Sequence, residues 1–254
     1  MSSARRAFAL LLTRLLLVAG VTVIAWALVA RLSGELSFPP NPMIAALSLL
    51  PVNVICLVIA SRMLRAEGQS IRELVGYRHG ALGRDIAWGI LWLVVLFIPF
   101  IIGIMGTAFV LHGAETFDAF ETMFYNPDAA AVIPSAAALV LGIVTFVTFA
   151  PLNAPTEEIV FRGYAQSRLS ASWSPAAAIA VSSIAFGLQH AFFAPTVDAM
   201  AVYVVAFTLW GACSAIIVRR QGRLLPVIIA HVIVNVFTSA PAIVFPALMI
   251  AGVF

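Results

Sequence analysis

The sequence predicts an all-α protein, a polytopic membrane helix bundle with about eight transmembrane helices. Of its 254 residues, 63% are hydrophobic and only 10% are charged, and the mean hydropathy is +1.07. Soluble domains usually carry about 25% charged residues, so a soluble fold of this composition would expose large apolar patches. This ratio of hydrophobic to charged residues excludes a disordered, collagen-like or nucleic-acid-binding chain and indicates a lipid bilayer as the surrounding medium.

Apolar runs long enough to cross a bilayer recur along the whole chain, since a spanning helix needs about 20 mostly apolar residues. Pro241 and Pro246 interrupt the last region, so seven spans with the final apolar stretch in the interface is the alternative. We expect one structural domain, in which residues 1–85 hold two spans and a surface connection and residues 86–254 hold the rest. The eight candidate spans are 8–30, 43–61, 86–111, 132–152, 175–193, 199–218, 225–240 and 242–254.

The arginines predict the orientation, because cytoplasmic connections of membrane proteins are enriched in basic residues. With the N-terminus in the cytoplasm, every arginine except Arg31 falls on the inner side. Arg14 interrupts the first apolar run and is expected to snorkel to the inner interface. All fourteen basic residues are arginine, which suggests a bacterial source and hence the bacterial inner membrane. The outer connection 112–131 carries no arginine and four carboxylates, those of Glu115, Asp118, Glu121 and Asp128.

Ionisable side chains inside apolar segments are the candidates for chemistry, because the cost of removing them from water needs a functional reason. All of them lie in the second half of the chain, in or beside predicted spans. The candidates are Glu157, Glu158, Arg162, His190 and His231, with Asn235 as a polar neighbour.

The two adjacent glutamates are expected to differ in role. Pro155 should end the preceding helix and Thr156 should cap the next one, which places both glutamates in a first turn. Glu158 and Arg162 are four residues apart, so they share a helix face and can pair. Glu157 is offset by about 100° around the helix and is expected to stay without that arginine. A carboxylate of this kind suits a general base.

The two histidines come from separate predicted spans. His231 and Asn235 are four residues apart, on one face of an apolar helix, which implies a polar partner inside the bundle. His231 lies about 9 Å and His190 about 22 Å from the inner ends of their spans, at the usual helical rise. Glu157 is expected just past the inner end of the fourth span, so His190 looks too deep to meet it. The conflict eases if the fifth span begins later than Pro175, or if Glu157 lies inside the bilayer.

Three motifs in this order resemble those of the CPBP intramembrane proteases, also called the Abi family, which include the type II CAAX prenyl endopeptidases. They are Glu157-Glu158-x-x-x-Arg162, Phe186-x-x-x-His190 and His231-x-x-x-Asn235. The resemblance spans about residues 130–240 and implies an intramembrane endopeptidase whose site opens to the cytoplasmic side. It implies that Glu157 and His190 activate a water, that His231 and Asn235 stabilise the oxyanion, and that Glu158 and Arg162 hold the helix.

The cofactor and the substrate stay open at this stage. Glu157, His190 and His231 could form a three-ligand zinc site, but the chain has no His-Glu-x-x-His motif. We favour glutamate catalysis without a metal. The expected substrate is a membrane-associated peptide or protein, and prenylated substrates are less expected in a bacterium.

Two other functions fit some of the same residues. A transporter or permease can use intramembrane Glu and His as a proton relay, but it predicts inverted repeats, and the polar residues here gather in one half of the chain. A non-catalytic membrane scaffold that binds a partner helix needs no water-activating carboxylate, so it predicts that Glu157→Gln keeps full activity in the host phenotype.

Overall fold

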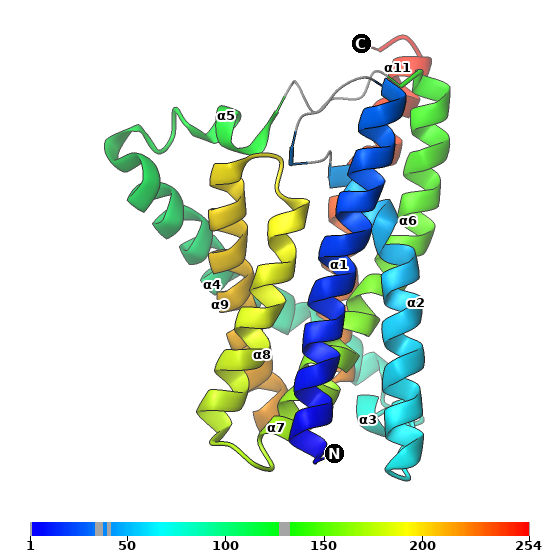
Figure 1. The fold of residues 1–254 in the computed structure, drawn as a ribbon, viewed down its shortest axis with the longest axis vertical. Coiled ribbons are helices and arrows are strands. Elements are labelled where there is room, and N and C mark those ends of the chain that lie inside the picture. The colour runs from blue at the N-terminus through cyan, green and yellow to red at the C-terminus, as the bar shows by residue number, and fades with distance from the viewer. Residues whose placement is uncertain (1, 34–37, 40–41, 127–132, 254) are drawn as a thin grey trace.

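Long apolar segments form long helices here because backbone groups in hydrocarbon must hydrogen-bond within their own segment. The computed structural model describes residues 2–33, 38–39, 42–126 and 133–253, and its all-helical architecture confirms the predicted fold class (Figure 1). Asp128 lies outside the described residues. The elements are α1 (Ser3–Ser33), α2 (Pro42–Ala66), α3 (Ile71–Val75), α4 (Leu82–His112), η1 (Gly113–Glu115), α5 (Phe120–Phe124), α6 (Ser135–Glu158), η3 (Ile159–Gln166), α7 (Ser167–Leu169), α8 (Pro175–Gln189), η4 (His190–Phe193), α9 (Val197–Gln221), α10 (Leu225–Ser239) and α11 (Pro241–Ile250).

Within the described ranges, seven helical stretches are long and apolar enough to cross a membrane. The chain is therefore an integral, multi-pass membrane protein, with one span fewer than the eight expected. The difference lies at the C-terminal end, where α10 and α11 together form the single stretch Leu225–Ile250. Pro241 stands at the first position of α11, where a missing N–H is tolerated. Seven crossings leave the two termini at opposite ends of the bundle (Figure 1).

The helix that carries the glutamates does not begin at Thr156, contrary to expectation. α6 runs through Pro151 and Pro155 and continues directly into the π-helical segment η3. Thr156 donates its hydroxyl to the Leu152 carbonyl at 2.6 Å instead of capping a helix. The fourth span therefore extends over Ser135–Leu169. Glu157 lies twelve residues before its end, roughly 18 Å into the bundle, which reconciles its depth with that of the histidines.

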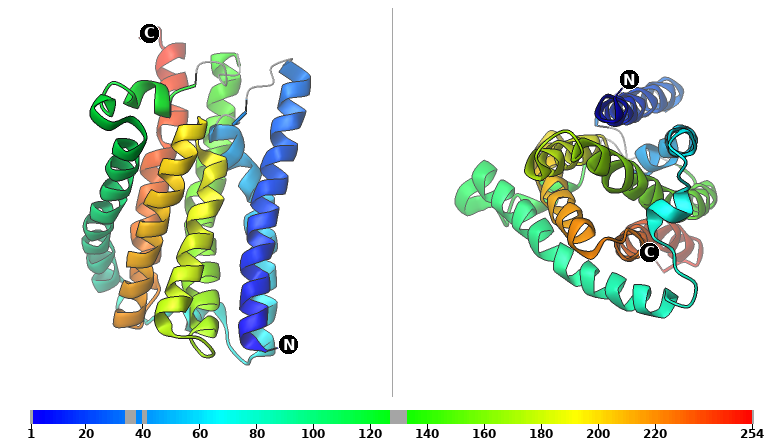
Figure 2. Two further views of the ribbon diagram at one scale, coloured as in Figure 1. Left: turned by 60° about the vertical axis from the view of Figure 1, so that its left-hand side comes forward. Right: turned by 90° about the horizontal axis from the view of Figure 1, so that it is seen from below.

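The helices pack around a central site. α4 lies across α9 and α10 on one side of the bundle, and α1 lies beside α2 and α8 on the other (Figure 2). α6 packs against α2, α10 and α11. Segments from both halves of the sequence are therefore in contact with the middle of the bundle.

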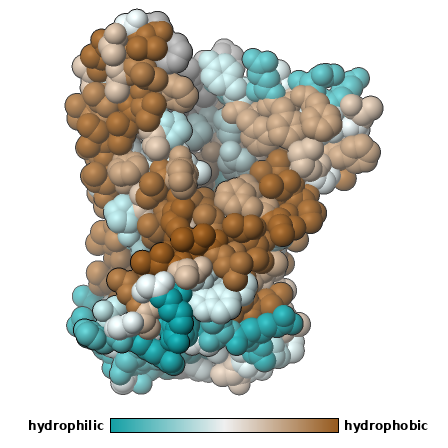
Figure 3. Space-filling view, turned by 180° about the vertical axis from the view of Figure 1, so that it is seen from behind, coloured by the Kyte–Doolittle hydropathy of each residue, from teal (hydrophilic) through white to brown (hydrophobic). Residues whose placement is uncertain are grey.

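The two ends of the bundle carry opposite charge. The end that holds the N-terminus is called here the arginine-rich end, and it forms a hydrophilic band below the apolar belt (Figure 3). The opposite end, called the acidic end, carries the exposed carboxylates of Glu115, Asp118, Glu121 and Asp198. Within the described residues, Arg31 is the only arginine at the acidic end. The arginine-rich end carries Arg5, Arg6, Arg62, Arg65, Arg72, Arg78, Arg84, Arg168, Arg219, Arg220 and Arg223.

Candidate active site

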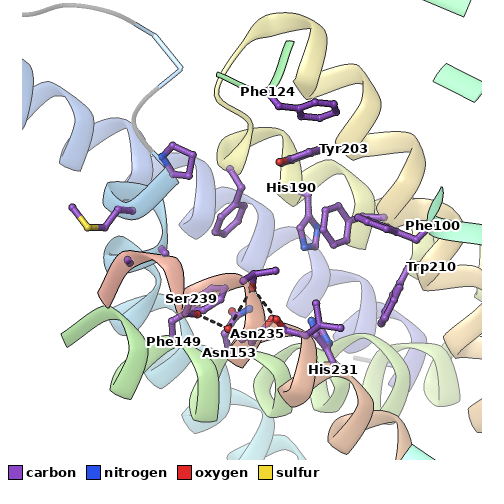
Figure 4. Close-up of a pocket in the computed structure, with 18 of the residues that line it drawn as sticks. Phe100, Phe124, Phe149, Asn153, His190, Tyr203, Trp210, His231, Asn235 and Ser239 are labelled. Atoms are coloured by element: carbon purple, nitrogen blue, oxygen red, sulfur yellow. Dashed lines mark hydrogen bonds between the residues drawn. The ribbon is translucent and has the colours of Figure 1, made fainter. Parts of the chain in front are cut away.

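A cavity of about 660 Å³ lies between α2, α4, α6, α9 and α10. Most of its wall is apolar, with many Phe, Tyr and Trp side chains, and Phe124, Tyr203 and His190 follow one another along one side (Figure 4). The polar groups gather at its floor, where the side chains of Asn153, His190, His231 and Asn235 face the cavity. An apolar chamber with a few converging polar groups is the usual form of a ligand or substrate site.

Glu157 lies immediately beneath this floor and is completely buried. Its Oε1 accepts hydrogen bonds from Arg14 Nη2 at 3.0 Å and Gln189 Nε2 at 2.8 Å. Its Oε2 has no hydrogen-bond partner among the described residues and lies 3.5 Å from His231 Nε2. One carboxylate oxygen is thus fixed, and the other remains available on the side of the imidazole.

Arg14 is part of the site, so the expectation that it snorkels to the interface is wrong. Its side chain is 0% exposed. The guanidinium donates to Gln189 Oε1 at 2.8 Å, to Asn53 Oδ1 at 3.1 Å and to Asn153 Oδ1 at 3.3 Å, besides Glu157. Four acceptors from three helices supply the hydrogen bonds that water would give at the interface, and such a buried charge requires them. Glu157 is not paired with Arg162, as expected, but it is not a free carboxylate, because Arg14 contacts it.

Glu158 and Arg162 form the predicted pair, with Nη1 3.2 Å from Oε1. Glu158 also accepts a hydrogen bond from His231 Nδ1 at 2.9 Å. The Arg162 guanidinium lies 3.9 Å from the centroid of the Phe186 ring, a cation–π contact. Glu158 therefore does more than hold its own helix, because its contact orients the imidazole of α10.

His190 is held by its backbone and by an aromatic ring. Its Nδ1 is 2.7 Å from the Phe186 carbonyl oxygen, and since a carbonyl only accepts, Nδ1 carries the proton. In the neutral imidazole, Nε2 is then free to accept. The ring stacks on Phe207, with centroids 3.5 Å apart and an interplanar angle of 10°. Asn235 Nδ2 has no partner within the described part of the chain and belongs to the same floor.

The structure therefore brings all six predicted residues to one place, in and beneath the cavity floor. Sequence reasoning missed four polar residues that surround Glu157: Arg14, Asn53, Asn153 and Gln189. Each is a polar side chain inside an apolar span, the signal that identified the other candidates. The first two lie in α1 and α2, so the site extends beyond residues 130–240.

The cavity extends away from the N-terminus. Its lining includes Pro42 at the start of α2, Phe124 of α5 and Ser239 at the end of α10, all at the acidic end. The sequence analysis expected the N-terminus and the site to face the same side. In this structure, the cavity reaches the end opposite the N-terminus, so both parts of that expectation cannot hold together.

The residues around Glu157 do not fit a zinc ion. Across the described ranges, no three His, Cys, Asp or Glu side chains form a group that could hold a metal. The Arg14 cation already contacts the Glu157 carboxylate at 3.0 Å, which disfavours a second cation on the same group. We therefore derive no catalytic step through a metal.

Comparison with known proteins gives one match. Residues 136–237 match the family described as type II CAAX prenyl endopeptidase Rce1-like. No curated protein and no solved structure matches the chain. The matched segment contains all three motifs, which confirms the resemblance and supports, at the level of the family, an intramembrane endopeptidase of the CAAX type.

Proposed function

Since residues 136–237 match the family described as type II CAAX prenyl endopeptidase Rce1-like, we propose that the protein hydrolyses a peptide bond in a membrane-associated protein or peptide, with Glu157 as general base. The observation that supports this most directly is the position of Glu157 Oε2. Among the described residues this oxygen has no hydrogen-bond partner, and it lies 3.5 Å from an imidazole that faces the cavity. A buried polar atom without a partner needs an explanation, and a catalytic role supplies one.

In the first step, a water on the cavity floor attacks the carbonyl carbon of the scissile bond. A new C–O bond forms, and the water proton passes to Glu157, while His190 Nε2 accepts a hydrogen bond from the water. Arg14 and Gln189 hold the other carboxylate oxygen, so the base is oriented before the substrate binds. Such preorganisation lowers the barrier because no reorientation is needed during the reaction.

The negative charge then develops on the former carbonyl oxygen. Asn235 Nδ2 and a protonated His231 Nε2 are the donors proposed to stabilise it. Glu158 accepts from His231 Nδ1 and would stabilise the charged imidazole. When the intermediate collapses, the C–N bond breaks and Glu157 returns its proton to the leaving amine, which yields one carboxyl and one amino product.

The same groups supply a base, oxyanion donors and a proton for the leaving group, so the proposed reaction needs no metal. Activity in the presence of a strong chelator tests this part separately. Undiminished turnover supports the glutamate mechanism. Loss of turnover that added zinc restores would overturn it in favour of a metallopeptidase.

The central experiment is cleavage of a peptide library by the purified protein in detergent, with Glu157→Gln as the test variant. We expect turnover to fall by about 100-fold or more, the range for a general base, with folding and peptide binding retained. Glu73→Gln is the matched control, because glutamine at this third helical position preserves the capping box with Ser70. Full cleavage by Glu157→Gln would refute the assignment of the base, whereas absence of cleavage by the unmodified protein would favour a scaffold.

A further inference from the structure

The cavity is closed at the arginine-rich end. There Arg223 donates to both carboxylate oxygens of Asp85 and to the carbonyl of Gly76. This cluster ties the start of α4 to the connection that precedes α10. α4 and α10 also approach closely, since a Cβ on Gly89 would lie 2.7 Å from a methyl carbon of Ile229. No described residue of the arginine-rich end is among those that line the cavity, so the cavity stops at its floor.

The cavity is open at the acidic end. On the far side of the bundle, a hollow separates the part formed by α4 and α5 from the part formed by α6 and α11 (Figure 3). Both parts contribute lining residues, among them Ile104 and Thr145. α4 packs against α9 and α10, and α6 against α10 and α11, so the two parts share α10 at the closed end and diverge towards the mouth.

The mouth combines an apolar inner face with an acidic rim. Phe120 and Phe124 of α5 turn towards the cavity, while Glu121 of the same short helix is exposed. Asp118 precedes this helix and Asp198 begins α9, both exposed at the same end. An apolar chamber below a carboxylate rim suits a ligand with a hydrophobic part and basic neighbours.

The asymmetry of charge predicts which side of the membrane the mouth faces. The arginine-rich end carries eleven arginines, and the positive-inside rule assigns such an end to the cytoplasm. The acidic end, with the mouth, then faces the extracytoplasmic side.

From these observations we infer that the cavity receives its substrate from the extracytoplasmic side. The inferred substrate is a membrane-anchored peptide whose apolar part fills the aromatic chamber and whose neighbouring residues are basic. The inference deepens the proposed peptidase function and rests on it for the substrate. The side of the mouth does not depend on catalysis.

Site-directed labelling tests the side of the mouth. In a background with Cys56 and Cys213 replaced by serine, Thr238→Cys places a thiol at an exposed position in the cavity lining. His79→Cys is the matched control, since it is exposed at the arginine-rich end. A membrane-impermeant maleimide should label Thr238→Cys in spheroplasts and His79→Cys only in inverted vesicles. The reverse pattern would overturn the inference and leave the peptidase proposal intact.

Substrate charge is tested with two peptides that share one apolar anchor and one scissile bond, flanked by lysines or by glutamates. We expect the lysine peptide to have the lower KM. Glu121→Gln should raise that KM by about two- to fivefold, the size of one exposed charge interaction, with kcat unchanged, and Glu73→Gln should not. Equal KM values for the two peptides, or no effect of Glu121→Gln, would refute the basic preference. Failure of both peptides to be cleaved by the unmodified protein would instead count against the peptidase proposal.

Discussion

Two adjacent glutamates each form a buried pair with an arginine, and the two pairs differ in how far apart their members lie in the sequence. Glu158 pairs with Arg162, one turn further along the same polypeptide segment. Glu157 pairs with Arg14 from the first helix, 143 residues away. The Arg162 pair links α6 and η3 to His231, whereas the Arg14 pair joins α1, α2, α6 and α8 through Asn53, Asn153 and Gln189.

The difference indicates a division of labour. The Arg162 pair is local and orients one imidazole. The Arg14 network holds Oε1 of Glu157 from several helices. Oε2 of both glutamates has no hydrogen-bond partner among the described residues, but that of Glu157 lies beneath the cavity floor, 3.5 Å from His231 Nε2. A catalytic base must be charged, oriented and not fully engaged, and the long-range network satisfies all three conditions. We therefore expect loss of Arg14 to affect turnover most, and loss of Arg162 to affect stability most.

Arg14→Gln should have the largest effect on turnover. It removes the cation that balances Glu157, and a buried carboxylate without a partner is neutralised by a proton. We expect kcat to fall by about 100-fold or more, as for loss of the base itself, with a smaller change in KM. Cleavage by Arg14→Gln/Glu157→Gln should be no slower than by either single variant, because all three lose the same function.

Arg5→Gln is the control for that experiment, since Arg5 lies on the same helix but is exposed. Arg14→Lys should restore part of the activity, because it returns the charge with fewer donors. Cleavage at the unmodified rate by Arg14→Gln would show that the network is dispensable and would remove the contrast between the two pairs.

Arg162→Met should chiefly lower stability. Removing one member of a buried pair leaves an uncompensated charge and typically costs about 3–5 kcal/mol. Unfolding followed by circular dichroism in detergent would measure the loss, and Glu158→Gln/Arg162→Met should recover part of it. Arg168→Met is the comparison, because the Arg168–Glu67 pair is partly exposed and should contribute less than about 1 kcal/mol. Equal losses for the two arginine variants would contradict the assigned role of Arg162.

The contrast also explains which parts of the site could be predicted. Glu158 and Arg162 follow from spacing alone, because residues four apart in a helix are neighbours. Partners such as Arg14 and Gln189 depend on how helices distant in sequence are packed, which periodicity does not encode. Arg14 was nevertheless detectable, since it is an ionisable residue within an apolar span. Assigning it to the interface overlooked the asparagines in α2 and α6 that could accept from it.

For the fold, too, local features of the sequence could be predicted, whereas features that depend on packing could not. Apolar run lengths predict the all-helical class and nearly the correct number of spans, because hydrocarbon thickness sets them. The proline residues were harder to interpret, because their effect depends on context. Pro155 lies inside α6 and Pro241 opens α11 without ending the span, whereas the sequence predicted a break at each.

A glycine on α8, the helix that carries Gln189, gives a smaller test. Gly187 allows α8 to approach α9, since a Cβ there would lie 2.5 Å from the Val204 carbonyl oxygen. Gly187→Ala should push α8 outward and displace Gln189 and His190, and we expect kcat to fall roughly tenfold from this misplacement. Gly106→Ala in α4 is the control, because no neighbouring atom lies within 4 Å of the added Cβ. Unchanged kcat in Gly187→Ala would show that the network tolerates movement of α8.

The smallest expected effect concerns Glu67, an ion-paired carboxylate outside the spans. Burial tends to raise the pKa of Glu67, but hydrogen bonds from Arg168 and Tyr164 and the charge of Arg6 outweigh it, so the pKa is lowered. A lowered pKa in the folded state means that the stabilisation is present above the ordinary carboxyl range and is lost as the pH falls through it. We expect Glu67→Gln to lower the free energy of unfolding by less than about 1 kcal/mol at neutral pH. The difference should vanish well below pH 4, where Glu67 is protonated in both the folded and the unfolded state. Unfolding midpoints of the two proteins across this pH range would measure the difference, and a difference that grows on acidification would contradict the assigned sign.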